Sequence, residues 1–569
     1  MQAKIKFVLG FFILVFVSLI ARLAYWQIIR GSELAGDAQN QYTSSKVTTA
    51  PRGNILASDG SFWVIRKDAW LVFANTNETV DYPKNIANKL APFFTEDPSD
   101  RFALLTEVLR IETLLGKKGA WIPIKQKVEQ DIKKNIEALK IKGIGFEPQE
   151  IRFYPEASSA AQLTGFVGKD EAGTDVGYFG LEGYYNLALS GKAGFVGREK
   201  DARGAPILLG DSREVSARPG VDLVTNIDKR IELLTEEKLK EGLEKYGARS
   251  GSAVVMDPRD GRVLSITAIP SYDPAKYWEY GDEFFKNPVI SDSFEPGSIF
   301  KVLVMASALD AGAVEPDTKC DACAGPLKVD KYFIKTWNNE YNDGITMTDT
   351  IIHSDNTGMA FAGQKLGADA MYNYLDKFGI GRLTGIDLQG EAAPRMRERG
   401  TWNIVDLATT SFGQGIAVTG IEMARAVSAI ANGGYLVTPR VVERIQGEGW
   451  SEDVRVEPPK RIISKKAAKE ITEMMEAAAD KGEAKWTNTR GFKVAGKTGT
   501  AQIPVAGHYD TENTNHSFIG FAPADKPEFL MLVTLQSPQS SPWASETAAP
   551  LWYTIAKDLF VYFGIEPEN

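Results

Sequence analysis

A serine and a lysine three residues apart provide the first candidate chemistry in this chain. Ser298 and Lys301 follow Pro296 and Gly297, which together signal the start of a helix. Residues 302–306 are apolar throughout, so this helix should be buried. Because burial lowers the pKa of a lysine, Lys301 could accept the hydroxyl proton of Ser298, which shares its helix face. The backbone amide of Ser298, free at the helix start, could then stabilise an oxyanion.

Two further motifs could complete such a site. One is Ser354-Asp355-Asn356, whose serine could relay a proton and whose asparagine amide could bond the backbone of a peptide. The other is Lys497-Thr498-Gly499-Thr500, in which the lysine and both threonine hydroxyls could gather a carboxylate. It ends a predicted strand at 492–496. Because Gly496 and Gly499 leave room for another backbone, an extended substrate could pair with this edge.

Each motif taken alone also has an explanation without function. Ser-x-x-Lys arises by chance about once or twice in a chain of this length. The segment 354–356 could be a helix cap or a turn, and 497–500 a plain strand end. The combination favours a single active site, because Ser-x-x-Lys, Ser-Asp-Asn and Lys-Thr-Gly in this order form a known catalytic signature.

The few histidines and cysteines exclude several other chemistries. The 3 histidines are His353, His508 and His516, and the 2 cysteines are Cys320 and Cys323. A zinc site with four cysteines is impossible, and one with two cysteines and two histidines would need distant ligands. The Cys-x-x-Cys could be a local disulfide or two free thiols, and the loop-like stretch before it disfavours a redox site. No Gly-x-Ser-x-Gly elbow is present, which disfavours a histidine-based hydrolase.

Composition narrows the class of protein. The chain has 569 residues, of which 43% are hydrophobic and 24% charged, as in globular proteins with ample core. At about 100–200 residues per domain, this length predicts about three folding units. The 65 Lys and Arg against 74 Asp and Glu give a net charge of −9, which disfavours nucleic acid as a partner, because phosphate binding needs a basic face.

The amino terminus carries a membrane signal. An apolar run from Phe7 to Ile29, interrupted at Arg22, is long enough to span a bilayer at about 1.5 Å per residue. Lys4 and Lys6 precede the run, so the positive-inside rule places the short tail in the cytoplasm and the rest of the chain outside. A cleaved signal peptide is the alternative, but no Ala-x-Ala site follows the run. The sequence has no second run of this length, which predicts a single-pass protein.

The remaining sequence mixes helix and strand patterns. Residues 84–142 are predicted to be largely helical, and 150–215, rich in glycine and tyrosine, to form short strands of a structural or interaction module. The later elements expected are an amphipathic helix at 228–246, a hairpin around 257–262, and strands at 491–502, 517–522 and 529–536. A sheet built from the first and last of these, with helices between, is an α+β plan.

Together the motifs resemble those of the class B (monofunctional) penicillin-binding proteins, the peptidoglycan D,D-transpeptidases, and the likeness covers nearly the whole chain. Segments similar to the amino-terminal pedestal of that family are Arg52-Gly53-Asn54-Ile55, Arg152-Phe153-Tyr154-Pro155 and Gly180-Leu181-Glu182-Gly183. Segments similar to its transpeptidase domain are Arg218-Pro219-Gly220, Met256-Asp257-Pro258 and Ser411-Phe412-Gly413-Gln414-Gly415. Leu56-Ala57-Ser58-Asp59 departs from the usual Asp-Arg-Asn-like turn of the pedestal, which leaves the chemistry unaffected.

The resemblance implies the architecture. It predicts an α+β fold with a tail and single transmembrane anchor at 1–30, an elongated mixed pedestal or dimerisation-like domain at 31–216, and a transpeptidase domain at 217–569. In that last domain, helices flank an antiparallel sheet.

The resemblance also implies a role for each site residue. Ser298 would attack the carbonyl of the penultimate D-Ala and form an acyl-enzyme, with Lys301 as the base. Ser354 and Lys497 would relay the proton to the leaving D-Ala, and Asn356 would hold the peptide amide. Thr498, Gly499 and Thr500 would bind the substrate, the two hydroxyls holding its terminal carboxylate, and the amides of Ser298 and Thr500 would form the oxyanion hole. No metal or organic cofactor is implied.

Partners and location follow from the same likeness. The implied ligands are peptidoglycan stem peptides on lipid-linked or nascent glycan, and β-lactams. The implied protein partners are a SEDS-type glycosyltransferase and other divisome proteins, at the bacterial cytoplasmic (inner) membrane with the catalytic domain outside. Residues 180–190 favour the division branch over the elongation branch. The alternatives are a D,D-carboxypeptidase, a β-lactamase-related penicillin-recognising protein, or a non-catalytic envelope scaffold. The Glu-x-x-Leu-Asn segment of class A β-lactamases is absent from the sequence.

Overall fold

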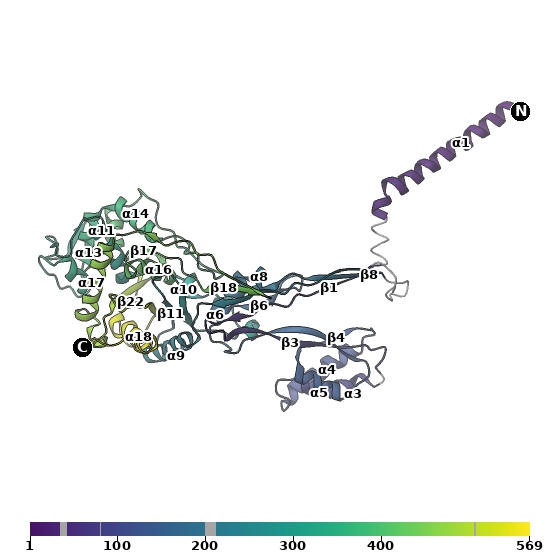
Figure 1. The fold of residues 1–569 in the computed structure, drawn as a ribbon, viewed down its shortest axis with the longest axis horizontal. Helices are drawn as coiled ribbons and strands as arrows, with labels where there is room; N and C mark the ends of the chain where they lie inside the picture. The colour runs from purple at the N-terminus through teal and green to yellow at the C-terminus, as the bar shows by residue number, and fades with distance from the viewer. Residues whose placement is uncertain (35–42, 80, 200–211, 506–507, 569) are drawn as a thin grey trace. The chain divides into compact units, whose positions relative to one another are not determined.

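The computed structural model describes residues 1–34, 43–79, 81–199, 212–505 and 508–568 (Figure 1). These residues form two compact units, one of 1–52 with 190–220 and one of 53–189 with 221–569. The smaller unit contains α1 (Gln2–Ala24), the π-helical turn η1 (Tyr25–Ile29) and an antiparallel sheet in the order β1-β8-β9 (Thr43–Thr48, Gly194–Glu199, Ser212–Val215). Residues 2–29 form a helix that is long and apolar enough to cross a membrane, and its apolar stretch is not buried against the rest of the chain.

The first sheet of the larger unit joins distant parts of the chain. Its strands are β2 (Ile55–Leu56), β3 (Phe62–Ala74), β4 (Ile122–Glu129), β5 (Ile144–Phe153), β10 (Asp222–Thr225), β18 (Val442–Gly447) and β19 (Trp450–Asp453). They run in the order β19-β18-β10-β2-β3-β4, and β5 pairs with β3. Three helices pack on the far half of β3 around a separate core: α3 (Pro83–Leu90), α4 (Arg101–Leu115) and α5 (Gln130–Ala138).

The expectation that 84–142 is largely helical was wrong for β4. Residues 122–129 alternate buried and exposed side chains in part of the strand and pair with β3. Apolar residues recur near helical spacing from 127 to 142, but within that range only α5, which begins at Gln130, is an α-helix. Pairing with a strand some 50 residues earlier decides the conformation here, and local periodicity does not contain that information.

Three of the segments that resemble the pedestal meet at one buried ion pair. Arg152 donates from Nε to Oε1 of Glu182 at 2.8 Å and from Nη1 to the carbonyl oxygen of Gly53 at 2.7 Å. The two charged side chains are 9% and 0% exposed. Gly53 itself has no room for a side chain, because a Cβ would lie 1.9 Å from the carbonyl oxygen of Val221. The ion pair therefore holds these three segments together.

The second sheet is the centre of the larger carboxy-terminal region. It is antiparallel, in the order β12-β11-β23-β22-β21, with bounds Val263–Ile269, Ser250–Met256, Phe529–Gln536, His508–Ala522 and Ala495–Val505. The expected hairpin, the expected late strands and the α+β plan are confirmed. The third motif lies inside β21 instead of ending a strand at 492–496, because pairing with β22 begins at Ala495.

Helices cover both faces of this sheet (Figure 1). On one face lie α9 (Lys229–Tyr246) and α18 (Ala548–Phe563). Helix α9 begins where the sequence predicts, with Asp228 as its cap. On the other face lie α11 (Lys301–Asp310), α16 (Gly420–Ala431) and α17 (Lys465–Lys481), with α12 (Met347–Ile352), α13 (Asn356–Leu366) and α14 (Ala368–Phe378) packed beyond. Residues of β23 alternate between two separate cores, which explains why its sequence is apolar almost throughout.

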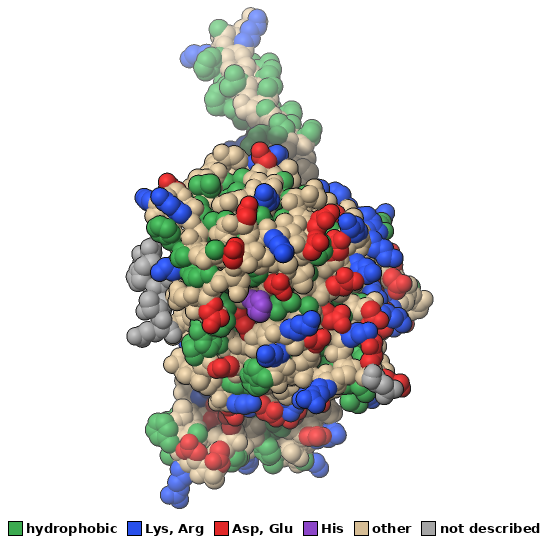
Figure 2. All heavy atoms as spheres, turned by 90° about the vertical axis from the view of Figure 1, so that its left-hand side faces the viewer, with side chains coloured by type: hydrophobic (Ala, Val, Ile, Leu, Met, Phe, Trp, Pro, Cys, Tyr) green, Lys and Arg blue, Asp and Glu red, His purple; other side chains and the backbone are tan. Residues whose placement is uncertain are grey.

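The surface of the molecule carries both signs of charge. Figure 2 shows Lys and Arg side chains intermixed with Asp and Glu, with hydrophobic side chains scattered among them. Opposite charges this close form exposed ion pairs, such as Lys469 with Glu473 at 3.6 Å on α17. Exposed pairs of this kind contribute little to stability, so the buried charged groups are the informative ones.

Glu232 on α9 is one such buried group and gives a stability prediction. Its side chain is 0% exposed and accepts a hydrogen bond from the Ile266 amide at 2.8 Å. Burial, with a smaller contribution from the charge of Glu236, raises the pKa of Glu232 from 4.5 to about 7. A raised carboxyl pKa means that the folded state holds the proton more tightly, so the free energy of unfolding falls as pH rises from 4.5 to about 7.

We therefore expect Glu232→Gln to stabilise the detergent-solubilised chain at pH 8 by about 1–3 kcal/mol, because the amide never ionises. The gain should largely vanish at pH 5. Thermal melting at both pH values checks this, with Glu244→Gln, an exposed site on the same helix, as the matched control. An equal change in melting temperature at both pH values would contradict the prediction.

Candidate active site

Ser298 lies in a 3₁₀ turn that leads directly into the buried helix α11. The turn η5 spans Gly297–Phe300, and α11 continues it from Lys301, as the Pro-Gly signal predicts. Gly297 has a φ of +54°, which favours glycine, and its N–H donates to the carbonyl oxygen of Gly413 at 3.1 Å. Ser298 is half-buried, whereas Lys301 is 0% exposed.

Lys301 connects the first motif to the second. Its Nζ lies 2.5 Å from the carbonyl oxygen of Ser354, 3.2 Å from the Ser354 hydroxyl and 2.7 Å from Oδ1 of Asn356. A neutral amine can donate to the carbonyl and the amide oxygen and still accept a hydroxyl proton on its lone pair. Burial and, to a lesser extent, the charge of Lys497 lower the pKa of Lys301 from 10.5 to about 7. Lys301 therefore has a substantial neutral fraction at neutral pH.

The second motif is both a helix cap and part of the site. Asp355 caps α13, and its Oδ1 accepts from the amides of Thr357 at 2.7 Å and Gly358 at 3.0 Å. The cap places Ser354 on one side, at a φ of +55°, and Asn356 on the other, where both reach Lys301. A non-glycine residue at this φ is strained, and such strain is often found at functional sites. The other end of the Asn356 amide is held by a second hydrogen bond, since its Nδ2 donates to the carbonyl oxygen of Lys335 at 3.0 Å.

The third motif lies on the edge strand β21. Lys497 is 4% exposed, and its Nζ lies 3.2 Å from Oγ1 of Thr498 and 3.3 Å from the Thr498 carbonyl oxygen. Burial lowers the pKa of Lys497 as well. Oγ1 of Thr500 accepts from the Ala544 amide at 3.1 Å. Among the described residues, β21 pairs with β22 alone, so β21 is an edge strand of the sheet.

Gly499 brings the third motif against the first. A Cβ on Gly499 would lie 2.9 Å from Cγ2 of Ile299 and 3.1 Å from the Pro296 carbonyl oxygen, and one on Gly297 would lie 3.0 Å from the Thr500 carbonyl oxygen. The expected close backbone approach at Gly499 is therefore present. At Gly496 the neighbour is the ring of Phe518 instead of a backbone, at 2.5 Å. Packing and direct bonds thus bring all three motifs together, from parts of the chain about 200 residues apart.

Glu483 is a charged group of this site that sequence reasoning missed. Thr498 donates from Oγ1 to Oε2 of Glu483 at 3.3 Å, and the Glu483 charge raises the pKa values of both Lys301 and Lys497. The residue stands between α17 and β21, outside any motif. Only the packing of α17 on β21 shows that it belongs to the site.

The described histidine side chains do not form a catalytic pair with Ser298. His516 is buried and lies 2.8 Å from Oγ1 of Thr514 and 2.6 Å from Oγ1 of Thr547, and burial lowers its pKa to about 4. His353 is exposed at the end of α12. The side chain of His508 lies outside the described residues. Cys320 and Cys323 form a disulfide, which decides between the two alternatives left open by the sequence.

Comparison with known proteins gives two matches to family models. The penicillin binding protein transpeptidase domain matches residues 251–559, and the penicillin-binding protein dimerisation domain matches residues 47–225. Together they include all three motifs. The chain belongs to the class B penicillin-binding proteins.

Individual relatives extend the likeness over the whole length. Stage V sporulation protein D of Bacillus subtilis is 30% identical, over 100% of this chain and 87% of its own. Peptidoglycan D,D-transpeptidase FtsI of Escherichia coli is 26% identical, over 98% of this chain and 92% of its own. The crystal structure of penicillin binding protein 3 from Mycobacterium tuberculosis, complexed with aztreonam, has a TM-score of 0.70 at 23% identity and covers 92% of this chain and 98% of its own. This last likeness bears on the fold.

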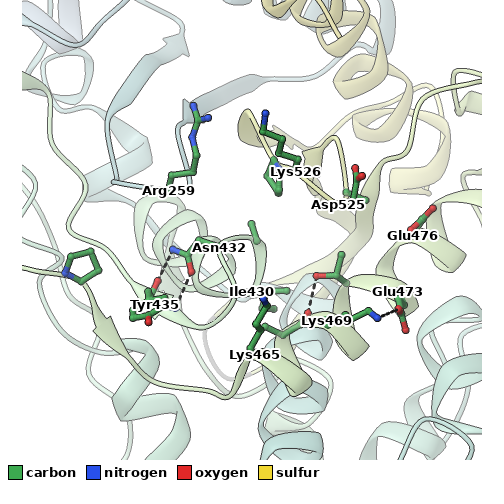
Figure 3. A pocket seen from close by; sticks show the side chains of 17 residues that line it. Arg259, Ile430, Asn432, Tyr435, Lys465, Lys469, Glu473, Glu476, Asp525 and Lys526 are labelled. Atoms are coloured by element: carbon green, nitrogen blue, oxygen red, sulfur yellow. Dashed lines mark hydrogen bonds and ion pairs between the residues drawn. The ribbon is translucent and has the colours of Figure 1, made fainter. Parts of the chain in front are cut away.

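A pocket of about 780 Å³ lies elsewhere on this penicillin-binding protein (Figure 3). Its walls come from the end of α16, from α17 between Lys465 and Glu476, and from the segment 524–527, with charged side chains from Arg259 and Lys526 around it. None of its lining residues belongs to the three motifs, so the pocket is separate from the catalytic groups.

The Gly413–Gly297 contact gives a prediction about the position of Ser298. Gly413 has a φ of +81°, and a Cβ there would lie 2.1 Å from the carbonyl oxygen of Gly297. Gly413→Ala must therefore displace the turn that carries Ser298, and we expect β-lactam acylation to slow by about tenfold or more, since small displacements of catalytic groups are costly. Gly433→Ala is the matched control, because its φ is +79° but nothing lies within 4 Å. Equal acylation rates in the two variants would refute this interpretation.

Proposed function

We propose that this penicillin-binding protein is a peptidoglycan D,D-transpeptidase that cross-links stem peptides through an acyl-enzyme on Ser298 and is inhibited by β-lactams. The observation that carries the proposal is the contact of the buried, low-pKa Lys301 with both Ser354 and Asn356. Such a constellation is suited to nucleophilic acyl transfer, because it supplies a neutral base and a relay hydroxyl in one water-poor site. Family membership and the names of the relatives agree with this reaction.

Acylation begins when the Ser298 hydroxyl gives its proton to the neutral Nζ of Lys301. The oxygen attacks the carbonyl carbon of the penultimate D-Ala, and the amides of Ser298 and Thr500 stabilise the resulting oxyanion. The close approach of Gly297 to the Thr500 carbonyl oxygen supports this pairing of amides. A β-lactam enters the same path because its ring amide presents the same acyl group.

The leaving D-Ala departs as a neutral amine after it receives a proton. The Ser354 hydroxyl lies 3.2 Å from Lys301 Nζ, and Ser354 and Lys497 together relay that proton to the leaving amine. Thr498 and Thr500 hold the terminal carboxylate beside Lys497, and Asn356 orients the peptide. An amine of a second stem peptide then attacks the ester, which forms the cross-link and regenerates Ser298.

The same proposal assigns the parts of the chain. Residues 1–30 serve as tail and anchor, 31–216 as pedestal, and 217–569 as transpeptidase domain outside the cytoplasmic membrane. The apolar helix and the disulfide support an extracytoplasmic location, because disulfides persist in oxidising compartments. A SEDS-type glycosyltransferase of the divisome would supply the glycan strands.

The test is product analysis with the full-length protein. Incubation with a lipid-linked peptidoglycan precursor and a glycosyltransferase should yield cross-linked muropeptides by liquid chromatography, and none with Ser298→Ala. Release of D-Ala without cross-links would indicate a carboxypeptidase, and rapid hydrolysis of penicillin a β-lactamase. Absence of any reaction, with a stable fold, would indicate a scaffold.

A further inference from the structure

The carboxylate of Glu483 lies at a position where the proposed reaction does not require a negative charge. Oγ1 of Thr498 donates to Glu483 Oε2 at 3.3 Å, and the same oxygen lies 3.2 Å from Nζ of Lys497. Glu483 is half-buried. One hydroxyl is thus shared between a lysine, a protein carboxylate and, in the proposed function, the carboxylate of the ligand.

The backbone just before Glu483 is tightly packed. Helix α17 packs on both α11 and β21 and ends at Lys481. A Cβ on the next residue, Gly482, would lie 2.4 Å from the Ala478 carbonyl oxygen and 2.8 Å from that of Ile352. The backbone immediately before Glu483 is therefore pressed against the end of α12, next to the second motif, and has little freedom to shift.

Glu483 opposes the effect of burial on the pKa values of Lys301 and Lys497. The charges that face Lys301 are Lys497 on β21, Asp355 before α13 and Glu483 after α17. Burial and Lys497 lower the pKa of Lys301, whereas Glu483 and Asp355 raise it. Asp355 is committed to two amides of its own helix, so Glu483 is the carboxylate whose hydrogen bond a ligand could replace.

We propose that Glu483 is a positioning residue that lowers the affinity of the active site for the carboxylate of its ligand. It does so by competing for the Thr498 hydroxyl and by offsetting the charge of Lys497. The proposal rests on the proposed function and deepens it. When a ligand carboxylate binds, the Thr498 hydroxyl must turn away from Glu483, and two carboxylates then share one lysine. Like charges at this range oppose each other, so affinity for the anionic ligand is lower than the lysine alone would give.

The experiment compares benzylpenicillin with its methyl ester. Acylation of the full-length protein and of Glu483→Gln is followed by stopped flow from pH 5.5 to 9, with the concentration dependence separating binding from the chemical step. For Glu483→Gln we expect about three- to tenfold tighter initial binding of benzylpenicillin at pH 9, where Lys301 is neutral, and little change for the ester. The acidic limb of the pH profile should move to lower pH, because a charge that raises the Lys301 pKa is gone.

Two further variants separate charge from structure. Glu483→Asp keeps the charge and should keep the wild-type pH profile. Glu473→Gln, on α17 at the separate pocket, should change neither quantity. Unchanged or weaker binding of benzylpenicillin to Glu483→Gln, or an equal gain for acid and ester, would overturn the proposal. Failure of the wild-type protein to acylate would instead overturn the proposed function.

Discussion

Replacement of Ser298 by alanine is expected to abolish covalent labelling by a fluorescent penicillin, with the rate falling on the order of 10³-fold or more. The reason is that the ester can form only on the nucleophile, and Ser298 is the second residue of η5, the turn that leads into Lys301 and packs against β21. Gel fluorescence of the labelled full-length protein, with mass spectrometry of the adduct-bearing peptide, measures the effect. The alanine variant should fold normally, because Ser298 is only half-buried and the turn is held by Gly297.

Ser307→Ala is the matched control on the same helix. Ser307 is buried on α11, but its hydroxyl donates to the Leu303 carbonyl oxygen at 2.7 Å and takes no part in the site. That variant should be labelled at the wild-type rate. Full labelling of Ser298→Ala would show that another group is the nucleophile and would remove the basis of the proposed mechanism.

The parts of the site that were predictable from sequence are those that local patterns determine. The apolar run after Lys301 predicts a buried helix, and burial of the helix predicts a lowered pKa for Lys301. The structure has both features. The glycine in Lys497-Thr498-Gly499 predicts that another backbone segment lies close to it, and in the structure the backbone at Pro296 does so. Patterns of this kind are sufficient because they follow from burial and steric size, which each residue type carries with it.

Other features depend on contacts between distant segments. Residues 122–129 form a strand only because β3 is available to pair with them, and Glu483 joins the site only because α17 ends beside β21. The sequence of 354–356 is compatible with either a helix cap or a functional motif, and in the structure the cap at Asp355 orients both Ser354 and Asn356. Sequence spacing could not reveal that the two readings are compatible.

Replacement of Lys301 by methionine is expected to slow acylation by about 10²–10⁴-fold, the usual contribution of a general base. Methionine has a similar length and suits the buried position, so packing on α11 should be preserved. In the wild type the rate should rise with pH through about 7, because burial and Lys497 lower the pKa of Lys301 to about 7 and only the neutral amine accepts the serine proton. Stopped-flow acylation by benzylpenicillin between pH 5.5 and 9 measures both the rate and its pH dependence.

The pH dependence distinguishes a catalytic Lys301 from a structural one. Without the amine, the step near pH 7 should disappear from the Lys301→Met profile, whereas loss of packing alone would lower the rate equally at every pH. Lys365→Met, at an exposed position on α13, should retain both the rate and the step. A step that persists near pH 7 in Lys301→Met would assign the titration to another group, and Lys497, whose pKa burial also lowers, would then be the base.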